Sequence, residues 1–551
     1  MSSYFDEASL VMIPSGYKDQ KVYSVKPLDG SGDLTFSRAS SATRVASNDL
    51  IEKVRTNLAL RSQSFATSAV WSTVSGTITN NAGTAPDGTN TASKIVAGNS
   101  DPYVYQSLTP SGQVTLSCYV KGVGSSIGKI ARILCASDFT DVTMDGTWQR
   151  IKVTHTASGS ELYGLEVPNP AATSDEVLMW GFQVEAGDIA TDYIATTTAA
   201  VSVGPVSGLP RLDYLNSTCP RLLLEPQRTN LALYSEQFNN SVWIKEPSNS
   251  ATANTIASPD GYVNADTITA ADGATINIYQ SQTSASNTVH TFSAFLKKNN
   301  LSEVQLYMFS SGFVSRATVN FDNGTITDVV GSGSTITNYG NGWYRCSIQG
   351  TINSGVGFTT GFLSTASSGS KSVYAYGGQL EVGAYATSYI PTLGTSVTRV
   401  ADVCSKSGIS SILPTQTGTL YVEFDWQKTP ADVPVLSIHN NSTGLAWIQK
   451  INSTTTQGTY FASGYIGSIN GTVSASAGIV KVAYAWTNGR QALYINGVQA
   501  GTATAAITDS NDFSIFEFNG FWGIQNIGTS IASALVFPTA LSNSDLAALT
   551  A

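Results

Sequence analysis

The chain has 551 residues, which is enough for about three or four domains. Only 12% of these residues are charged, against roughly 25% in an ordinary soluble domain, so solubility must come from Ser, Thr, Asn and Gly. The net charge of -9 argues against a nucleic-acid partner or an anionic membrane surface, and the absence of any run of 18 apolar residues argues against membrane insertion.

Residues 1–50 are not repeated elsewhere and predict only short strands, at 8–14, 21–25 and 34–36. The first seven residues are acidic, whereas a signal peptide needs a basic start followed by an apolar core. We therefore expect synthesis in the cytoplasm without a signal peptide. The cysteines are odd in number and form no Cys-x-x-Cys pair, which predicts reduced thiols instead of disulfides or a zinc site. They are Cys118, Cys135, Cys219, Cys346 and Cys404.

A long unit occurs twice, at residues 51–200 and 227–395. Its first motif, Arg-Thr-Asn-Leu-Ala-Leu, starts at Arg55 and again at Arg228. Later motifs recur in the same order: Pro86-Asp87-Gly88 with Pro259-Asp260-Gly261, Trp148-Gln149-Arg150 with Trp343-Tyr344-Arg345, and Gln183-Val184-Glu185 with Gln379-Leu380-Glu381. The offset grows from 173 to 196 residues, which predicts that the second copy carries insertions confined to loops. A unit of this length is a duplicated domain, not a solenoid repeat.

Apolar and polar residues alternate within each copy, as at 114–120 and 290–296, with the period of half-buried strands. Turn residues such as Asn323-Gly324 separate these strands and predict hairpins. Each copy is therefore predicted to be an antiparallel jelly roll or β-sandwich, with the same strand order in both. Trp148 and Trp343 alternate with apolar residues and are expected in the two cores.

Two connectors frame the second copy, at 201–226 and 396–417. The first is rich in proline and predicts a stiff, extended spacer. From 418 to 551 the pattern changes to longer alternating strands, with a hairpin turn at Asn496-Gly497 and one short helix after Ser542 as its cap. The predicted fold class is all-β, with tandem jelly rolls followed by a C-terminal sandwich.

The repeated motifs, from Arg-Thr-Asn-Leu through Trp-x-Arg to Gln-x-Glu, resemble the jelly-roll carbohydrate-binding-like modules found in tandem in bacteriophage structural proteins. The strand Leu493-Tyr494-Ile495 with its Asn-Gly turn, and the ending at 541–549, resemble laminin-G and concanavalin-like sandwiches. The segments 8–14 and 28–40 are similar to the N-termini of phage fibre proteins, including those of crAss-like phages of Bacteroides.

This resemblance implies a structural, homotrimeric virion fibre of the head or tail. Residues 1–50 would attach the fibre to other virion proteins, and the modules would bind host-surface or mucus glycans. A virion protein released by lysis also needs no export signal, in agreement with the N-terminal sequence. Two alternatives stay open: a tailspike-type glycan depolymerase, and a purely structural capsid decoration protein without a ligand.

Sugar recognition needs flat aromatic side chains that can stack on the ring, with amides or carboxylates for the hydroxyl groups. The candidates are Trp71, Trp243, Tyr105, Tyr279, Trp447 and Trp522. Packing in a core or against another subunit is the alternative for each of them.

Calcium is a second candidate ligand, because carboxylates recur at equivalent places and calcium binds oxygen ligands. The candidate ligands are Asp87 and Glu185 in the first copy and Asp260 and Glu381 in the second. These carboxylates could equally accept hydrogen bonds from the start of each copy, near Asn57 and Asn230. No other cofactor is predicted.

The sequence favours binding over catalysis. His155, His290 and His439 are the only histidines, each in or beside a predicted strand, and no nucleophile-elbow motif is evident. The strand that starts at Glu423 resembles a glucanase Glu-x-Asp-x-x-Glu pattern, but Lys428 replaces the last acid. Glycoside hydrolysis needs two carboxyl groups, so we expect no enzymatic activity.

Overall fold

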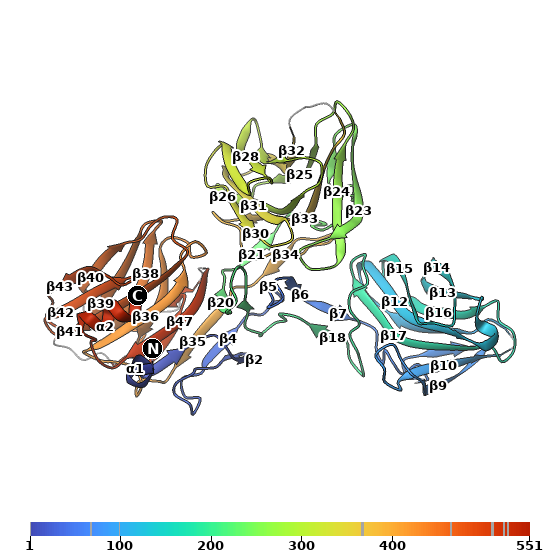
Figure 1. Ribbon diagram of the computed structural model, residues 1–551, viewed down its shortest axis with the longest axis horizontal. Coiled ribbons are helices and arrows are strands. Elements are labelled where there is room, and N and C mark those ends of the chain that lie inside the picture. The colour runs from blue at the N-terminus through green and yellow to red at the C-terminus, as the bar shows by residue number, and fades with distance from the viewer. Residues whose placement is uncertain are drawn as a thin grey trace.

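The structure, a computed structural model, describes residues 2–66, 69–98, 100–364, 369–462, 465–507, 512–521, 524–525 and 528–551. Three β-sandwiches surround a small central region (Figure 1). The predicted all-β fold class is confirmed. The described residues also form the helices α1 (Ser2–Glu7) and α2 (Asn543–Thr550) and the 3-10 turn η1 (Gly124–Ser126), and no helix among them could cross a membrane.

The two repeated units, which we call module 1 and module 2, are sandwiches with the same strand order. In module 1 one sheet has the order β15 (Gln149–Ala157), β12 (Gly112–Val123), β17 (Glu176–Ala186), β10 (Ala92–Ala97), β9 (Gly76–Gly83). The other has the order β14 (Asp138–Thr143), β13 (Ile130–Cys135), β16 (Glu161–Asn169), β11 (Tyr103–Leu108), β8 (Ser72–Val74).

Module 2 repeats this arrangement and extends it. Its first sheet has the order β30 (Thr335–Asn338), β31 (Trp343–Ile352), β26 (Thr288–Lys298), β33 (Lys371–Val382), β24 (Val263–Ala270), β23 (Asn249–Ala257). Its second has the order β29 (Thr325–Val330), β28 (Phe313–Asn320), β27 (Glu303–Phe309), β32 (Gly357–Leu363), β25 (Asn277–Thr283), β22 (Ile244–Lys245). The additional residues are not confined to loops, contrary to the prediction, because β29 and β30 add an edge strand to each sheet.

The third sandwich, which we call the composite sandwich, is assembled from three separate segments of the chain. One sheet has the order β19 (Leu212–Asp213), β20 (Arg221–Leu224), β47 (Thr529–Phe537), β36 (Gly418–Asp425), β41 (Ile479–Thr487), β42 (Arg490–Ile495), β43 (Val498–Ala503), with β1 (Leu10–Met12) also paired to β47. The other has the order β2 (Tyr17–Lys18), β3 (Lys21–Val22), β4 (Leu34–Ser37), β35 (Val403–Ser407), β44 (Ile515–Phe518), β37 (Val433–His439), β38 (Gly444–Asn452), β39 (Thr455–Ala462), β40 (Tyr465–Thr472). A short ribbon, β45 (Gly520–Phe521) with β46 (Ile524–Gln525), lies beside it.

The N-terminal residues are therefore part of this sandwich and do not form a separate unit. Leu10 and Phe36 are fully buried in its core, and β4 pairs with β35. The proline-rich connector also contributes two strands, since β19 pairs with β20 and β20 pairs with β47. Strands of four or five residues, such as β4, β20 and β35, are too short to show a clear periodicity, so only the folded chain reveals these pairings. At the other end, the predicted helix cap is confirmed, because the Ser542 hydroxyl accepts a hydrogen bond from Asp545 N at 3.2 Å.

Both modules are insertions whose two ends meet in a short ribbon. In module 1 the ribbon is β7 (Arg55–Asn57) with β18 (Val201–Val203), and in module 2 it is β21 (Arg228–Asn230) with β34 (Val397–Arg399). The asparagine of the repeated motif explains its recurrence. Asn57 donates to Phe182 O and Ile194 O and accepts from Ala59 N and Val184 N, and Asn230 makes the same four bonds. All hydrogen-bonding positions of the buried amide are thus used.

A buried cluster of charged side chains, which we call the hub, joins the segments where the insertions begin and end. It consists of Arg38, Arg211, Glu225, Arg399 and Asp402. Arg38 and Arg211 both bind Asp402, the former at 3.0 Å. Arg211 and Arg399 both bind Glu225, at 2.7 and 2.9 Å.

The hub also fixes module 2. The Glu225 carboxylate accepts hydrogen bonds from Ser388 N at 2.7 Å and from Ser388 Oγ at 2.6 Å, and Ser388 belongs to the end of that module. Arg399 adds a bond to Pro226 O at 2.7 Å. The Arg38, Arg211 and Asp402 side chains have no exposed surface. Charges removed from water this completely are tolerated only when each is paired, so the segments must come together as a set.

We expect Glu225→Gln to lower the free energy of unfolding by roughly 3 to 5 kcal/mol, because it leaves Arg211 and Arg399 buried with incomplete pairing. Denaturant unfolding of the full chain measures this. Glu176→Gln is the matched control: Glu176 pairs with Lys94 at 2.9 Å on the surface, and its loss should cost about 1 kcal/mol or less. Equal costs for the two variants would contradict the assigned role of the hub.

The hub also predicts acid sensitivity. Burial alone would raise the pKa of Glu225, but attraction by Arg399 and Arg211 outweighs it and lowers the pKa. A lowered folded-state pKa gives stability that is present above the unfolded value of about 4.3 and is lost as the pH falls below it. Stability should therefore fall as the pH drops below about 4.3 and keep falling toward the lowered folded-state pKa, and it should fall less in Glu225→Gln, which urea titrations at each pH would show. The same fall in both proteins would contradict this assignment.

Candidate functional site

Both modules carry the same aromatic cluster on the outer face of one sheet. In module 1 it lies where β12 pairs with β17, and in module 2 where β26 pairs with β33, and both pairings are interrupted by a bulge. Gly181 and Gly377 occupy the two bulges with φ of 70° and 61°, a conformation that favours glycine. In module 1 this leaves Trp180 on the outer face while Phe182 returns to the core.

Three rings form the cluster of module 1. The centroid of Trp180 lies 5.5 Å from that of Tyr119 and 4.4 Å from that of Tyr193. Hydrogen bonds fix two of the rings, since Trp180 Nε1 donates to Thr91 Oγ1 at 3.0 Å and the Tyr193 hydroxyl bonds to Ser62 Oγ. Rings held in this way are preorganised for an apolar contact. Trp180 is only 4% exposed and is tilted by 62° against Tyr119 and by 54° against Tyr193, so the half-buried Tyr119 and Tyr193 offer the more accessible rings.

A cavity of about 440 Å³ opens over these rings. Its other walls are Gln63, Pro86, Asp87 and Ala195. Asp87 is exposed, and its Oδ1 accepts hydrogen bonds from Thr89 Oγ1 at 2.6 Å and from Thr89 N at 2.9 Å. These bonds lower the pKa of Asp87, so the cavity has a carboxylate at its rim at neutral pH. Apolar walls with a few fixed polar groups are typical of small-ligand sites.

Module 2 has the same cluster, but another part of the chain fills it. The equivalents of Tyr119, Trp180, Tyr193, Gln63 and Asp87 are Phe295, Tyr376, Tyr389, Glu236 and Asp260, respectively. Lys53 enters from the hairpin formed by β5 (Thr43–Val45) and β6 (Ile51–Lys53). Its Nζ lies 2.7 Å from Glu236, 3.0 Å from Asp260 and 3.1 Å from the Tyr376 hydroxyl.

The rest of the hairpin covers the face of module 2. Ile51 N donates to Pro259 O at 2.9 Å, and Val45, Ile51 and Leu215 pack on the cluster. A Cβ placed on Gly261 would lie 2.8 Å from Leu50 Cδ1, whereas one on the equivalent Gly88 would meet no atom within 4 Å. The two faces therefore have equivalent residues. The hairpin of the same chain covers the face of module 2, whereas it does not cover the face of module 1.

The prediction that Trp71 and Trp243 are exposed ligand platforms is wrong. They are 3% and 1% exposed, because each closes the end of its module core. Their indole groups donate to backbone carbonyls, Trp71 to Arg61 O at 3.3 Å and Trp243 to Tyr234 O at 3.1 Å. Both residues are in turns, where no periodicity indicates which side chain is buried.

The other predicted aromatic residues do not line the cavity. Tyr105 is half-buried on the second sheet of module 1 and stacks on Tyr103 at 4.7 Å. Tyr279 occupies the equivalent strand of module 2 and donates to Glu246 at 3.1 Å. Trp447 is half-buried on β38 of the composite sandwich. Trp522 lies outside the described residues.

Trp148 and Trp343, which we expected in the module cores, instead border the outer clusters. Trp343 is 2% exposed because the hairpin covers it, whereas Trp148 is half-buried. Their indole groups make equivalent bonds, to Ala257 O at 3.1 Å and to Thr84 O at 3.2 Å. The prediction of burial is therefore correct for Trp343 but not for Trp148. Neither tryptophan lies in the core between the two sheets of its module.

The four candidate calcium ligands serve other contacts. Glu185 accepts from Thr191 Oγ1 at 2.6 Å, and Glu381 accepts from Thr387 Oγ1 at 2.7 Å, so this duplicated carboxylate closes a turn in each module. Asp87 binds Thr89 and Asp260 binds Lys53. Within the described part of the chain no group of three His, Cys, Asp or Glu side chains is arranged to hold a metal ion. The carboxylates therefore bond to groups of the protein, but the hydrogen bonds from the start of each copy near Asn57 and Asn230, which the alternative to calcium predicts, are not among these contacts.

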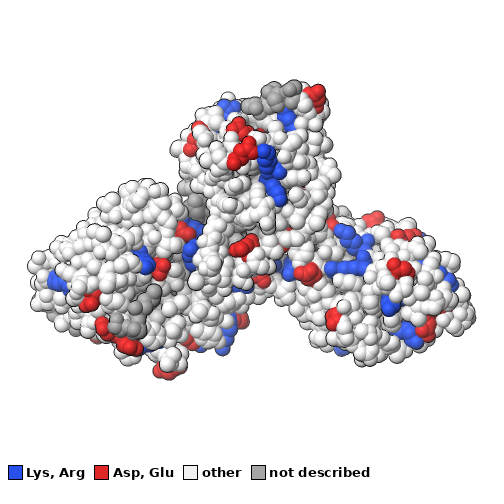
Figure 2. Space-filling model, in the orientation of Figure 1, with Lys and Arg blue, Asp and Glu red and all other residues white. Residues whose placement is uncertain are grey.

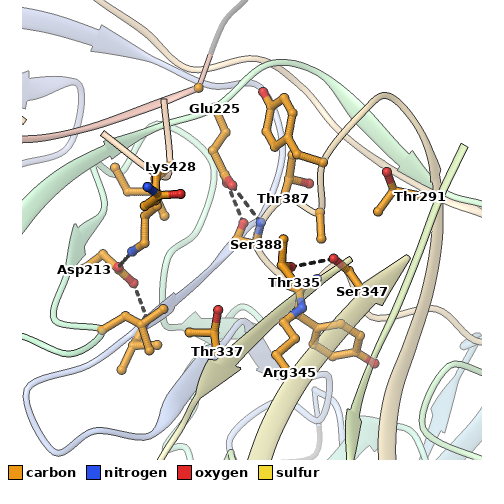
Figure 3. A pocket seen from close by; sticks show the side chains of 18 of the residues that line it. Asp213, Glu225, Thr291, Thr335, Thr337, Arg345, Ser347, Thr387, Ser388 and Lys428 are labelled. Carbon is orange, nitrogen blue, oxygen red and sulfur yellow. Dashed lines mark hydrogen bonds and ion pairs between the residues drawn. The ribbon is translucent and has the colours of Figure 1, made fainter. Parts of the chain in front are cut away.

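A second cavity, of about 360 Å³, lies between module 2, the hairpin and the composite sandwich (Figure 3). The charged groups on its walls pair with groups of the protein: Glu225 with Ser388, and Lys428 with Asp213 at 3.0 Å. Thr335 and Ser347 bond to each other at 2.6 Å. This cavity lies at the contact between module 2 and the composite sandwich, and the bonds along its walls help to hold module 2 in place.

The carboxylates and histidines considered for catalysis are likewise engaged. Asp425 lies 3.7 Å from Arg221, and Glu423 accepts from Ser533 at 3.2 Å. His155 lies between Asp138 and Glu161, at 2.7 and 2.9 Å, and His439 contacts Glu517 at 3.1 Å. Each of these contacts is within a sheet or between adjacent strands of one sandwich.

The sequence interpretation missed Tyr119, Trp180 and Tyr193. The repeat contains a signal for them, since Tyr119, Trp180 and Tyr193 align with Phe295, Tyr376 and Tyr389 and aromatic character is kept at all three positions. Tyr119 also alternates with core residues on its strand, which places it outward. The bulge hides the outward direction of Trp180, because it shifts the alternation by one residue.

No family model and no curated protein matches the chain. Among solved structures, the CBM40 of the Ruminococcus gnavus IT-sialidase bound to alpha2,3 sialyllactose is 18% identical and covers 26% of this chain and 91% of its own, with a TM-score of 0.23. The CBM22-1-CBM22-2 tandem of Paenibacillus barcinonensis Xyn10C is 11% identical and covers 59% and 98%, with a TM-score of 0.23. The LG1-3 region of the laminin alpha2 chain is 11% identical and covers 80% and 96%, with a TM-score of 0.18. These distant similarities concern the fold alone.

We expect Trp71→Ala and Trp243→Ala each to lower the free energy of unfolding by roughly 3 to 5 kcal/mol, because each removes a buried aromatic side chain from a packed core. Trp148→Ala is the control and should cost clearly less, since Trp148 is half-buried on the outer face. Thermal and denaturant unfolding measure the difference. If Trp148→Ala proved the most costly of the three, the assignment of these tryptophans would be wrong.

Proposed function

We propose that this chain is a carbohydrate-binding adhesion protein whose binding site is the open outer face of module 1. The observation that supports the proposal is the preorganised cluster of Tyr119, Trp180 and Tyr193 beneath an open cavity. Aromatic faces of this kind stack on the apolar face of a sugar ring. Gln63 and Asp87 supply an amide and a carboxylate for its hydroxyl groups.

The setting that we propose is a bacteriophage virion, with the chain as a homotrimeric fibre of the head or tail on the virion surface. The sequence resemblance and the scarcity of charge support this setting, and most of the surface visible in Figure 2 is uncharged. Because residues 2–37 are built into the composite sandwich, that sandwich is the candidate base for contact with other virion proteins. Modules 1 and 2 project from it (Figure 1).

The proposed role is binding without catalysis. A depolymerase would release reducing ends from a bound polysaccharide, and a decoration protein would bind no glycan at all. The same experiment therefore separates the three functions: a panel of host-surface and mucus polysaccharides is tested for binding to the full chain and for new reducing ends.

We expect Tyr119→Ala to weaken binding to a captured glycan by roughly tenfold or more, because it removes one of the two more accessible aromatic rings of the cluster. Tyr105→Ala is the matched control, as it removes a half-buried tyrosine from the other sheet of the same module. Isothermal titration with each variant provides the measurement. Unchanged binding by Tyr119→Ala would place the glycan elsewhere, and release of reducing ends would favour the depolymerase.

A further inference from the structure

We propose that the ligand at the open face of module 1 carries a primary ammonium group, as an amino sugar with a free amine does. This inference rests on the glycan binding proposed above and names the class of sugar. Its basis lies within the chain itself, because the equivalent face of module 2 already holds an ammonium group, that of Lys53.

The contacts of Lys53 define what this kind of site recognises. An ammonium group has three donors, and Glu236, Asp260 and the Tyr376 hydroxyl surround Nζ. The ammonium also lies 5.5 Å from the centre of the Tyr376 ring, within the range of a cation–π contact. Two carboxylates, a hydroxyl and an aromatic face thus hold one cation.

Module 1 keeps part of this set and changes the rest. Asp87 keeps the carboxylate of Asp260, whereas Trp180, which is 4% exposed, replaces Tyr376 and leaves the Tyr376 hydroxyl without a counterpart. Gln63 replaces Glu236, so that a neutral amide stands where the second carboxylate was. A neutral amide beside the half-buried rings of Tyr119 and Tyr193 suits the hydroxyl groups and ring of a sugar better than a bare lysine side chain. An amino sugar uses both the retained and the altered groups.

Each cluster has an arginine close to its aromatic rings, so this positive charge is common to modules 1 and 2. The Arg150 guanidinium lies 5.3 Å from the centre of the Tyr119 ring, and in module 2 Arg345 lies 5.2 Å from the centre of the Phe295 ring. Both arginines bond to a serine of the neighbouring strand, at 3.0 and 3.1 Å. Because Lys53 is bound in module 2 beside this arginine, the same arrangement in module 1 is compatible with an ammonium ligand.

The test compares two oligomers of equal length, one of glucosamine with free amines and one of N-acetylglucosamine, by isothermal titration of the full chain. We expect the amine form to bind roughly tenfold more tightly, because only it forms a charged hydrogen bond with Asp87. Asp87→Asn should remove this preference, and Gln63→Glu should increase it by restoring the second carboxylate. Asp141→Asn is the control, since Asp141 binds Arg132 at 2.7 Å on the other sheet and should not affect binding.

Equal binding of the two oligomers would overturn the ammonium inference and leave the proposed glycan function intact. Capture of other glycans in a Tyr119-dependent manner, with neither oligomer bound, would do the same. If neither oligomer nor any other glycan bound but a peptide of residues 43–53 did, both proposals would fail and the face would be a docking site for a protein hairpin. A preference for the amine that persists in Asp87→Asn would also overturn the inference.

Discussion

The paired charges of the hub determine how the whole chain is arranged. Arg38 comes from the N-terminal segment, Arg211 and Glu225 from the first connector, and Asp402 from the second. Apolar packing tolerates small shifts, but an ion pair without water is stable only at short distance and with its partner present. The three segments therefore cannot be placed one at a time. This constraint explains how a sandwich interrupted by two whole modules still brings its strands into register.

Modules 1 and 2 can be inserted without separating the segments of the hub, because the two ends of each module lie side by side. Each is tied off by a two-stranded ribbon and by one asparagine with four buried hydrogen bonds, so that inserting the module leaves the sandwich strands close together. The modules differ in how far they are fixed. Module 2 is held by its ribbon, by Ser388 on the hub and by the hairpin across its outer face. Module 1 is held by its ribbon and by contacts such as Tyr262 with Asp192, at 2.9 Å, which leave its own face uncovered.

The sequence predicts what depends on local pattern. The duplicated strands, the Asn496-Gly497 turn between β42 and β43 and the cap at Ser542 all follow from residues close in the chain. The composite sandwich was not predictable in this way, since Leu10 pairs with Val536 across almost the full length of the chain. The candidate site was missed for a related reason: the burial of Trp71 just after a turn and the placement of Trp180 on the outer face at a bulge both depend on tertiary packing. The repeat showed which positions matter but not on which side they lie.

The aromatic clusters of modules 1 and 2 have equivalent residues but differ in their exposure to solvent. This exposure affects which polar groups each cluster needs to hold a cation. Lys53 is almost fully removed from water, with 13% of its side chain exposed, and burial of the ammonium alone would lower its pKa. Attraction by Asp260 and Glu236 outweighs this effect and raises the pKa, so that the lysine is charged and both carboxylates are needed. A ligand at the open face keeps part of its hydration and faces a smaller desolvation cost. For the ligand that we propose, one carboxylate at the rim and the accessible aromatic rings would then be enough, and module 1 retains these groups.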